Sequence, residues 1–324
     1  MTSACADLRR ARPLLGTFVD IEVAALDRER GHAAIDAAFA AIALVHRLMS
    51  FHEPDSDVSR LNRDARGAPV AVHPWTYEVL TAAAEFRSAS AGLFDVSIAH
   101  HLQARGVLPR EPSTLRHAPT CSGHPRRADS IGDCTLLADV DGPDKPGHDE
   151  TGRVILLANN TVRFASADVR IDLGGIAKGF AVDRAVQVLR QRGIARGVVN
   201  AGGDLFAFGG AHAVDLRDPR HPAALLGRLV LADQAVASSA CTLPGAARSL
   251  IVDPRTGRAA GATLGATVVA CHAVTADALT KLVMLLGREA APLLARYGAR
   301  VLFAAADGVL HVTDDWPEVL GHAA

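Results

Sequence analysis

The chain has 324 residues, enough for one large domain or two ordinary ones. Hydrophobic residues make up 49% of it and charged residues 21%, which is ordinary for a folded soluble protein. A formal net charge of -1, with only 4% aromatic residues, argues against a nucleic-acid or anionic-membrane partner.

The cysteines and the first residues indicate the compartment. The five cysteines are scattered, odd in number and form no CxxC pair, which fits a reducing compartment better than a disulfide framework. The first 20 residues contain arginines but no apolar core of a signal peptide. No apolar run reaches membrane-spanning length. We therefore expect a cytoplasmic protein without a membrane segment.

The first third of the chain contains one strand pattern and several helix patterns. Alternating apolar residues over Phe18–Val23 predict a strand. An apolar stripe at helical spacing over Gly31–Met49 predicts a helix. A polar loop follows, and Ser56 or Asp57 is expected to cap a short helix after it. Pro74–Ser90 is predicted as a further helix.

Three polar residues near these elements have both an ordinary and a functional interpretation. His52 and Asn62 flank the short helix, and solvated surface is the ordinary explanation for such a loop. Asp95 follows a glycine-to-apolar transition, where an acid usually caps the next turn. A ligand role for His52 or Asn62 requires that the two converge on one site.

Residues 110–153 differ in composition from the rest. They are rich in Pro, Gly, Asp and His and carry little periodic apolar content. A long stretch of this kind inside a domain is usually functional or disordered. Its cysteines and histidines match none of the usual spacings of zinc ligands. We predict an inserted surface loop at 110–153, between the two parts of one domain at 1–109 and 154–324.

The centre of the chain carries the most informative pattern. It predicts a strand, a glycine turn, a helix, a second strand and a second glycine turn, at Val169–Leu173, Gly174–Gly175, Ile176–Arg192, Val198–Val199 and Ala201–Asp204. A glycine turn that opens a helix leaves N–H groups facing outward, a geometry that suits a phosphate or pyrophosphate. Many such turns only pack a helix against a sheet. Lys178 and Asp172 beside the turn favour a nucleotide-like ligand.

The C-terminal half alternates strands with helices. Further strands are predicted at Val154–Phe164, Leu229–Val236, Ser249–Val252, Gly265–His272 and Val301–Ala304. One helix is expected from Thr275 as N-cap to Gly287, and another over Glu289–Tyr297. Asp277 lies in the first turn of the former, where dipole complementarity is the ordinary reason for an acid. Thr280 and Lys281 share its face.

Several ordered motifs together resemble one family. They are LLGT, MSFHEPDSDVSRLN, GLFDVSI, IDLGGIAKGFAVDRA, VNAGGDL, VDPRTG and TADALTKLVMLLG. The chain resembles the ApbE family, the FAD:protein FMN transferases, from Leu15 to Gly287 apart from the insert. That family binds FAD with Mg²⁺ and attaches the FMN half to a threonine or serine of a target protein, releasing AMP.

The resemblance implies the fold. It predicts an α+β protein with two lobes, mixed sheets covered by helices, and FAD in the cleft between the lobes. A doubly wound NAD-type fold is the alternative. It is disfavoured because the glycine turns lie mid-chain and no GxGxxG pattern is present.

The resemblance also implies the site. It assigns FAD contacts to the positions of Leu15, His52, Asn62, Leu93, Phe94, Asp95, Asp172, Lys178, Ile251 and Thr280. It places Mg²⁺ on the backbone carbonyl of Gly175 and the carboxylate of Asp277, with a third ligand at the position of Lys281.

Three departures from the family pattern bear on activity. Leu250 stands where the family has a histidine that is a candidate general base, and leucine cannot accept a proton. Ser238–Cys241 replaces the family's Ser-Gly-Asp segment. Lys281 replaces a metal-binding threonine, one place after Thr280. Its ammonium either takes the charge role of Mg²⁺ or leaves room for Mg²⁺ on Thr280.

The leading hypothesis is FMN transfer to a threonine or serine of a partner flavoprotein. His272 is a substitute candidate for the base, although a strand-end histidine bonded to backbone is the ordinary explanation. The alternatives are a non-catalytic FAD-binding protein and an FAD pyrophosphatase that gives FMN and AMP with water as acceptor.

Overall fold

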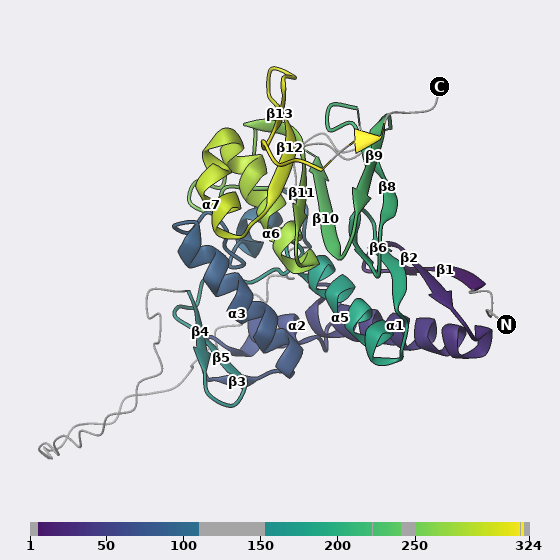
Figure 1. The fold of residues 1–324 in the computed structure, drawn as a ribbon. Helices are drawn as coiled ribbons and strands as arrows, with labels where there is room; N and C mark the ends of the chain where they lie inside the picture. Colours follow the sequence, from purple (N-terminus) through teal and green to yellow (C-terminus); the bar gives the residue numbers. More distant parts are fainter. Residues whose placement is uncertain (1–5, 110–152, 222, 241–250, 318, 321–324) are drawn as a thin grey trace, which may run out of the picture.

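An antiparallel sheet of eight strands forms the centre of the computed structural model, which describes residues 6–109, 153–221, 223–240, 251–317 and 319–320 (Figure 1). The strands lie in the order β1 (Ala6–Leu14), β2 (Thr17–Ala25), β6 (Arg196–Ala201), β7 (Asp204–Phe208), β10 (Gln234–Ala240), β11 (Thr263–Ala270), β12 (Arg300–Ala305) and β13 (Leu310–Val312). This arrangement of sheet and helices confirms the predicted α+β class.

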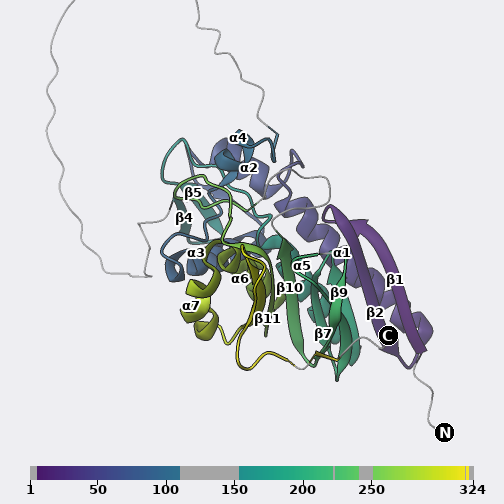
Figure 2. The ribbon, with the colours of Figure 1, turned by 90° about the horizontal axis from the view of Figure 1, so that it is seen from above.

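Helices cover one face of this sheet (Figure 2). They are α1 (Arg28–Met49), α5 (Ala177–Gln191) and α6 (Ala273–Leu286), and α5 packs between the other two. Smaller helices are α2 (Asp57–Asp64), α3 (Pro74–Ala89), α4 (Ala99–Ala104), the 3₁₀ helix η1 (Gly287–Ala290) and α7 (Ala291–Arg296).

The predicted helix stripe in α1 forms part of the main core. Ile35, Phe39 and Ile42 are fully buried, and the Asp27 carboxylate caps the helix by accepting from the N–H of Arg30 at 3.0 Å. By length and composition alone α1 is apolar enough to cross a membrane, but 44% of that window is buried inside the protein. A core helix passes the same test, so the resemblance to a membrane span is weak.

The other face of the sheet carries a second apolar core. Side chains of β7 alternate between the two faces, because successive residues of a strand point in opposite directions. Phe206 and Phe208 contribute to the main core, whereas Leu205 and Ala207 face the second. A three-stranded sheet covers this second core, in the order β14 (Val319–Leu320), β9 (Leu225–Leu231) and β8 (His212–Arg217).

A smaller group of elements lies to one side of the large sheet (Figures 1 and 2). It comprises α2, α3, α4 and a three-stranded sheet in the order β3 (Val70–Ala71), β5 (Thr161–Phe164) and β4 (Val154–Leu157). Ser56 caps α2, its Oγ accepting from the N–H of Ser59 at 3.0 Å, as predicted. The predicted insert at 110–153 falls outside the described residues except for Arg153, so its character stays a prediction.

Three strand predictions need correction. Val169–Leu173 forms no strand, because its backbone bonds to an asparagine side chain and to a loop rather than to a sheet. Val154–Phe164 is a hairpin of two strands. Leu229–Val236 spans the end of β9 and the start of β10, with Asp233 in the turn at φ +51°. Asn159 and Asn160, both at positive φ, mark the turn of the hairpin, as Asp233 marks the turn between β9 and β10.

Other boundaries also differ. The helix α6 begins at Ala273 with His272 at its N-cap position, so Thr275 lies inside it and caps nothing. The predicted helix at Glu289–Tyr297 is divided between η1 and α7. In Ser249–Val252 only the last two residues are described, and Val252 makes a single bridge to Ala259. β1 was not predicted, since its arginines interrupt the apolar alternation.

Candidate active site

The predicted glycine turn is held in place by a buried side chain from α2. Asn62 donates through Nδ2 to the carbonyl of Ile171 at 2.9 Å and accepts on Oδ1 from its N–H at 2.7 Å. The N–H of Asp172 donates to the carbonyl of Val96 at 2.8 Å. Both polar atoms of Asn62 are therefore occupied by backbone. It positions the turn, and the FAD contact that the resemblance assigns to it stays a prediction.

The N–H groups of the turn are less open than the sequence suggests. Gly174 donates to the Asp172 carboxylate at 3.0 Å, and both Ile176 and Ala177 donate to the carbonyl of Leu173. Further into α5, the N–H of Gly179 donates to another carboxylate. Four N–H groups of the segment 174–179 are thus used inside the chain. The expectation of an outward-facing nest of amides is wrong for these four.

Charged side chains, rather than free amides, dominate the region behind the turn. Lys178 on α5 forms an ion pair with Asp204, at the start of β7. Lys281 on α6 forms an ion pair with Asp277, one turn earlier on the same helix. The carboxylate side chains are 1% and 0% exposed, whereas the lysine side chains are 30% and 19% exposed. We call these four residues the lysine–aspartate cluster.

Burial and the charges within the cluster shift the pKa values of Asp204, Asp277 and Lys178. Burial, with the charge of Asp277, raises the pKa of Asp204 to about 6 despite the lysines. Burial acts in the same direction on Asp277, but Lys178 and Lys281, with the N–H of Gly179, hold the pKa of Asp277 below its usual range. Burial disfavours the charge of Lys178, yet the two carboxylates raise its pKa. Lys178 is therefore cationic at neutral pH.

The two helices that carry the lysines meet at a glycine. A Cβ at Gly179 would lie 2.2 Å from the carbonyl oxygen of Ala273 and 2.8 Å from the Cβ of Asp277. No real Cβ tolerates backbone at that distance. Gly179 therefore sets how closely α5 approaches α6, and it also supplies the N–H that holds Asp277 Oδ2 at 3.0 Å.

We expect Gly179→Ala to force the helices apart and to cost roughly 1–3 kcal/mol of the free energy of unfolding, as overpacking does. Urea unfolding followed by circular dichroism measures this. Gly261→Ala is the matched control, because a Cβ there meets nothing within 4 Å. Equal stability losses in both variants would contradict the packing argument.

Asp183 fixes the start of α6, a role that the sequence did not reveal. Its two carboxylate oxygens accept from the N–H groups of Ala273 and Val274 at 2.8 and 2.9 Å. Burial raises the pKa of Asp183, although these two N–H groups oppose the shift. Since Asp183 lies on α5, the helix of Lys178 holds the helix of Lys281 at its N-terminus.

Asp183→Ala should leave those two N–H groups without acceptors and lower the free energy of unfolding by about 1–3 kcal/mol. Asp183→Asn keeps one acceptor oxygen and should lose less. Urea titration of the two variants against the parent tests this order. A smaller loss in the alanine variant would show that the carboxylate does not hold α6.

Thr280 is fully buried, and its hydroxyl is occupied. Oγ1 donates to the carbonyl of Asp277 at 2.8 Å and lies 2.9 Å from Ser239 Oγ on β10. It also lies 3.2 Å from Lys281 Nζ. The proposed shift of a metal ligand onto Thr280, and its assigned FAD contact, are therefore not supported by these bonds.

Other residues assigned by resemblance are partly structural. Phe94 is buried, packs on Phe86 at 5.6 Å between ring centroids, and reaches Gly175. Asp95 accepts from the N–H and hydroxyl of Ser97 at 2.8 and 2.7 Å and pairs with Arg87. The turn-capping interpretation of Asp95 therefore describes its contacts better than a ligand role.

The remaining assigned side chains are Leu15, Leu93, Ile251 and His52. Leu15 has φ +55°, a left-handed conformation that costs a non-glycine residue roughly 1 kcal/mol or more. Leu15, Leu93 and Ile251 are partly buried against the main core. His52 is exposed, and its charge opposes the burial that raises the pKa of Asp172.

Of the two base positions, only His272 lies among the described residues. His272 is exposed beside Asp183, and within the described part of the chain no hydrogen bond joins it to the lysine–aspartate cluster. Leu250, like Cys241, lies outside the described residues, so its surroundings stay untested. The sequence indicates a glycine turn at Ala201–Asp204 but does not identify Asp204 as a site residue. Its ion pair with Lys178 is visible only in the fold.

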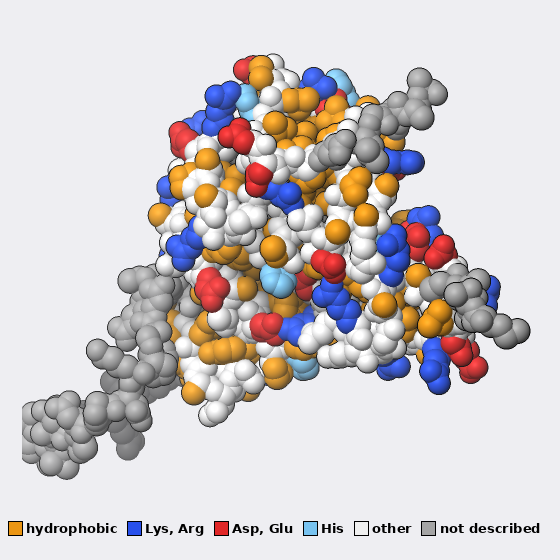
Figure 3. Space-filling view, in the orientation of Figure 1, with side chains coloured by type: hydrophobic (Ala, Val, Ile, Leu, Met, Phe, Trp, Pro, Cys, Tyr) orange, Lys and Arg blue, Asp and Glu red, His pale blue; other side chains and the backbone are white. Residues whose placement is uncertain are grey.

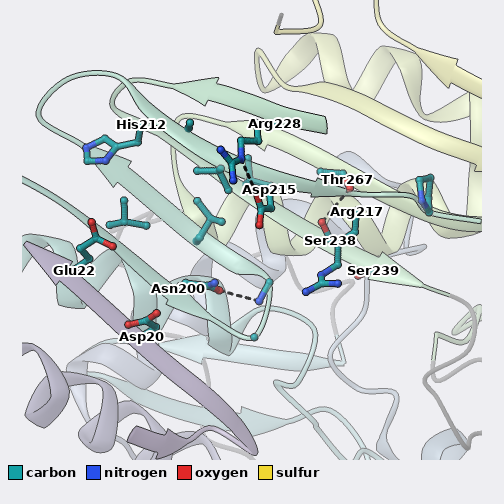
Figure 4. A pocket seen from close by; sticks show the side chains of 18 of the residues that line it. Asp20, Glu22, Asn200, His212, Asp215, Arg217, Arg228, Ser238, Ser239 and Thr267 are labelled. Atoms are coloured by element: carbon teal, nitrogen blue, oxygen red, sulfur yellow. Dashed lines mark hydrogen bonds and ion pairs between the residues drawn. The ribbon is translucent and has the colours of Figure 1, made fainter. Parts of the chain in front are cut away.

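A cavity of about 1020 Å³ lies on the far side of the large sheet, under β8 and β9. Figure 4 shows Arg217 near Ser238 and Ser239 toward one end, and Glu22 and His212 toward the other. The residues that line it include none of those predicted to contact FAD. Gly203 and Leu205, on either side of Asp204, are among its lining residues, and Ser239 Oγ in its wall lies 2.9 Å from Thr280 Oγ1. The ordered motifs and the perturbed pKa values coincide instead at the glycine turn.

Figure 3 shows one face of the molecule in the orientation of Figure 1, with acidic and basic side chains interspersed. Fold and site together define an α+β protein that presents two lysine ammonium groups beside a glycine turn. The chain belongs to the ApbE family, whose model matches residues 15–303.

Individual relatives agree with this assignment. The FAD:protein FMN transferase of Salmonella typhimurium is 25% identical over 89% of this chain and 81% of its own length. That of Rhodobacter capsulatus is 24% identical over 97% of this chain and 57% of its own length, and that of Treponema pallidum 28% over 62% and 51%. The chain thus spans only about half the length of the last two relatives.

Solved structures share the fold. The ApbE protein of Thermotoga maritima aligns with a TM-score of 0.75 at 24% identity, covering 95% of this chain and 97% of that one. The apo form of the Pseudomonas stutzeri flavinyl transferase ApbE gives a TM-score of 0.75 at 19% identity and covers both chains completely.

Proposed function

We propose that this protein transfers FMN from FAD to a threonine or serine hydroxyl of a partner flavoprotein. The names of its relatives and the ordered motifs support this activity. The structural observation that carries it is the pair of partly exposed lysine side chains, Lys178 and Lys281, beside the glycine turn. Two fixed cations at a turn of this kind suit the pyrophosphate of a dinucleotide.

The reaction is a phosphoryl transfer. The acceptor oxygen attacks the phosphorus of the FMN half, the bond to the bridging oxygen breaks, and AMP leaves with that electron pair. Negative charge builds on the phosphoryl and leaving oxygens, where Lys178 and Lys281 stabilise it. The hydroxyl proton passes to solvent, because a loose transition state places little demand on a strong base.

Mg²⁺ is the cofactor that the family resemblance predicts, and the donor set here does not fit it. Mg²⁺ requires near-octahedral oxygen ligands. Asp277 Oδ1 is paired with Lys281 and Oδ2 with the N–H of Gly179. Among the described residues no group of three or more His, Cys, Asp or Glu side chains could hold a metal ion. No step is therefore assigned to the metal.

The location and domain assignments remain proposals. Exposed, unpaired Cys271 is compatible with the reducing cytoplasm that the scattered cysteines suggest. Asn62 binds the backbone of Ile171 across the insert, which supports one domain built from 1–109 and 154–324.

One incubation separates the hypotheses. The purified protein is mixed with FAD and a flavoprotein domain that carries an acceptor threonine, with and without Mg²⁺. Acceptor mass rising by one FMN, with AMP released, supports the transferase. Free FMN and AMP with an unmodified acceptor would indicate the pyrophosphatase. Intact bound FAD would leave only a flavin-binding protein.

A further inference from the structure

We propose that the ammonium of Lys281 takes the place of the divalent cation, so that this protein binds FAD and neutralises its pyrophosphate without Mg²⁺. This inference rests on the proposed function of the same site. It concerns how charge is supplied there, and the contacts of the Lys281 side chain carry it.

The side chain of Lys281 fills the space between the two expected metal ligands. A Cβ at Gly175 would lie 3.8 Å from both Cγ and Cε of Lys281, so the aliphatic stem passes directly beside that backbone. The ammonium then meets Asp277 Oδ1 and lies 3.2 Å from Thr280 Oγ1. A cation with oxygen neighbours is thus already present between Gly175 and Asp277, and it is covalently part of the chain.

The oxygens nearby are occupied. Asp277 Oδ2 accepts from Gly179, and the Thr280 hydroxyl bonds to the carbonyl of Asp277 and to Ser239. In the described part of the cluster only Asp204 Oδ1 is buried without a partner. Mg²⁺ usually takes one or two carboxylates together with water and substrate phosphates. The carboxylate at the expected position, that of Asp277, is already engaged by Lys281 and by the N–H of Gly179.

The charge balance also opposes a metal. The cluster holds two ammonium groups and two carboxylates, so it is neutral before any ion enters. A divalent ion between Gly175 and Asp277 would lie a few ångströms from Lys178 and Lys281, where repulsion between like charges is large in a buried site. Lys281 would have to leave Asp277 or lose its proton. Its side chain is 19% exposed, so the ammonium can still reach a bound anion.

Two variants test the inference by binding rather than by transfer. Lys281→Thr removes the internal cation and restores a neutral oxygen ligand. Lys281→Met removes the cation alone and is the matched control. FAD affinity is measured by flavin fluorescence anisotropy in EDTA and in Mg²⁺, and metal binding by electron paramagnetic resonance of Mn²⁺. Circular dichroism verifies that each variant is folded.

The parent protein should bind FAD equally well in EDTA and in Mg²⁺ and should hold no Mn²⁺. Both variants should bind FAD roughly tenfold more weakly in EDTA, the loss expected for one charged contact. Mg²⁺ should restore affinity only in Lys281→Thr, which should also bind Mn²⁺.

FAD binding by the parent that depends on Mg²⁺, or Mn²⁺ binding by the parent, would overturn the inference without any variant. A Lys281→Thr protein that gains no metal site would overturn it as well. Neither measurement uses an acceptor protein. A parent protein that binds FAD without Mg²⁺ but never transfers FMN would therefore contradict the proposed function and leave this inference intact.

Discussion

Replacing Asp277 by alanine should slow FMN transfer strongly and also weaken the fold. The variant leaves the ammonium groups of Lys178 and Lys281 facing the single carboxylate of Asp204, and breaking a buried ion pair costs roughly 3–5 kcal/mol. The rate of AMP release should fall by roughly 10²–10³, the usual effect of losing a preorganised electrostatic group. Urea unfolding and chromatography of AMP measure the two effects.

Asp277→Asn separates fold from function, because it keeps the shape and the acceptor for the N–H of Gly179. It should recover part of the stability but little of the rate. Asp64→Ala, at a half-exposed pair with neighbouring Arg63, is the control and should change neither. An Asp277→Ala protein with normal AMP release would show that the cluster is not the active site.

The second large effect is a pH-dependent loss of stability in Lys178→Met. Without its ion-pair partner the pKa of Asp204 should rise further above its present value of about 6. An acid whose folded pKa exceeds its unfolded value binds more protons when folded, so stability falls as pH rises between the two values. The variant should therefore lose about 3 kcal/mol near pH 8 but clearly less near pH 5.

Urea titrations at the two pH values measure that difference. The double variant Lys178→Met with Asp204→Asn removes both charges, so it should lose most of the pH dependence and regain stability. A loss in Lys178→Met that is equal at both pH values would contradict the assignment of the raised pKa to Asp204.

Local patterns predicted the helices well and the distant contacts poorly. The apolar stripe of α1 and the Ser56 cap of α2 depend on residues a few positions apart, so the sequence suffices for them. Val169–Leu173 alternates like a strand, yet its partner is Asn62, 109 positions away. Periodicity cannot distinguish a segment paired with a sheet from one paired with a side chain.

The same limit applies to the site. The motifs placed Gly175, Lys178 and Asp277 in one region, as the fold shows. They could not show that Asp204 pairs with Lys178 or that Asp183 caps α6, because both contacts join separate elements. Nor could they show that the carboxylate of Asp95 is used by Ser97 and Arg87. The residue type of Asp95 suggested a ligand, whereas its tertiary contacts show a structural role.

The contacts that hold α5 against α6 determine how the rate of FMN transfer responds to substitutions away from the site. Gly179, Asp183 and Asp277 fasten the two helices together, so the positions of both ammonium groups are settled when the chain folds. Little dipolar rearrangement is then needed as charge develops on the phosphoryl oxygens. Substitutions at any of these contacts should raise the reorganisation energy of the reaction, even where they touch neither FAD nor the acceptor.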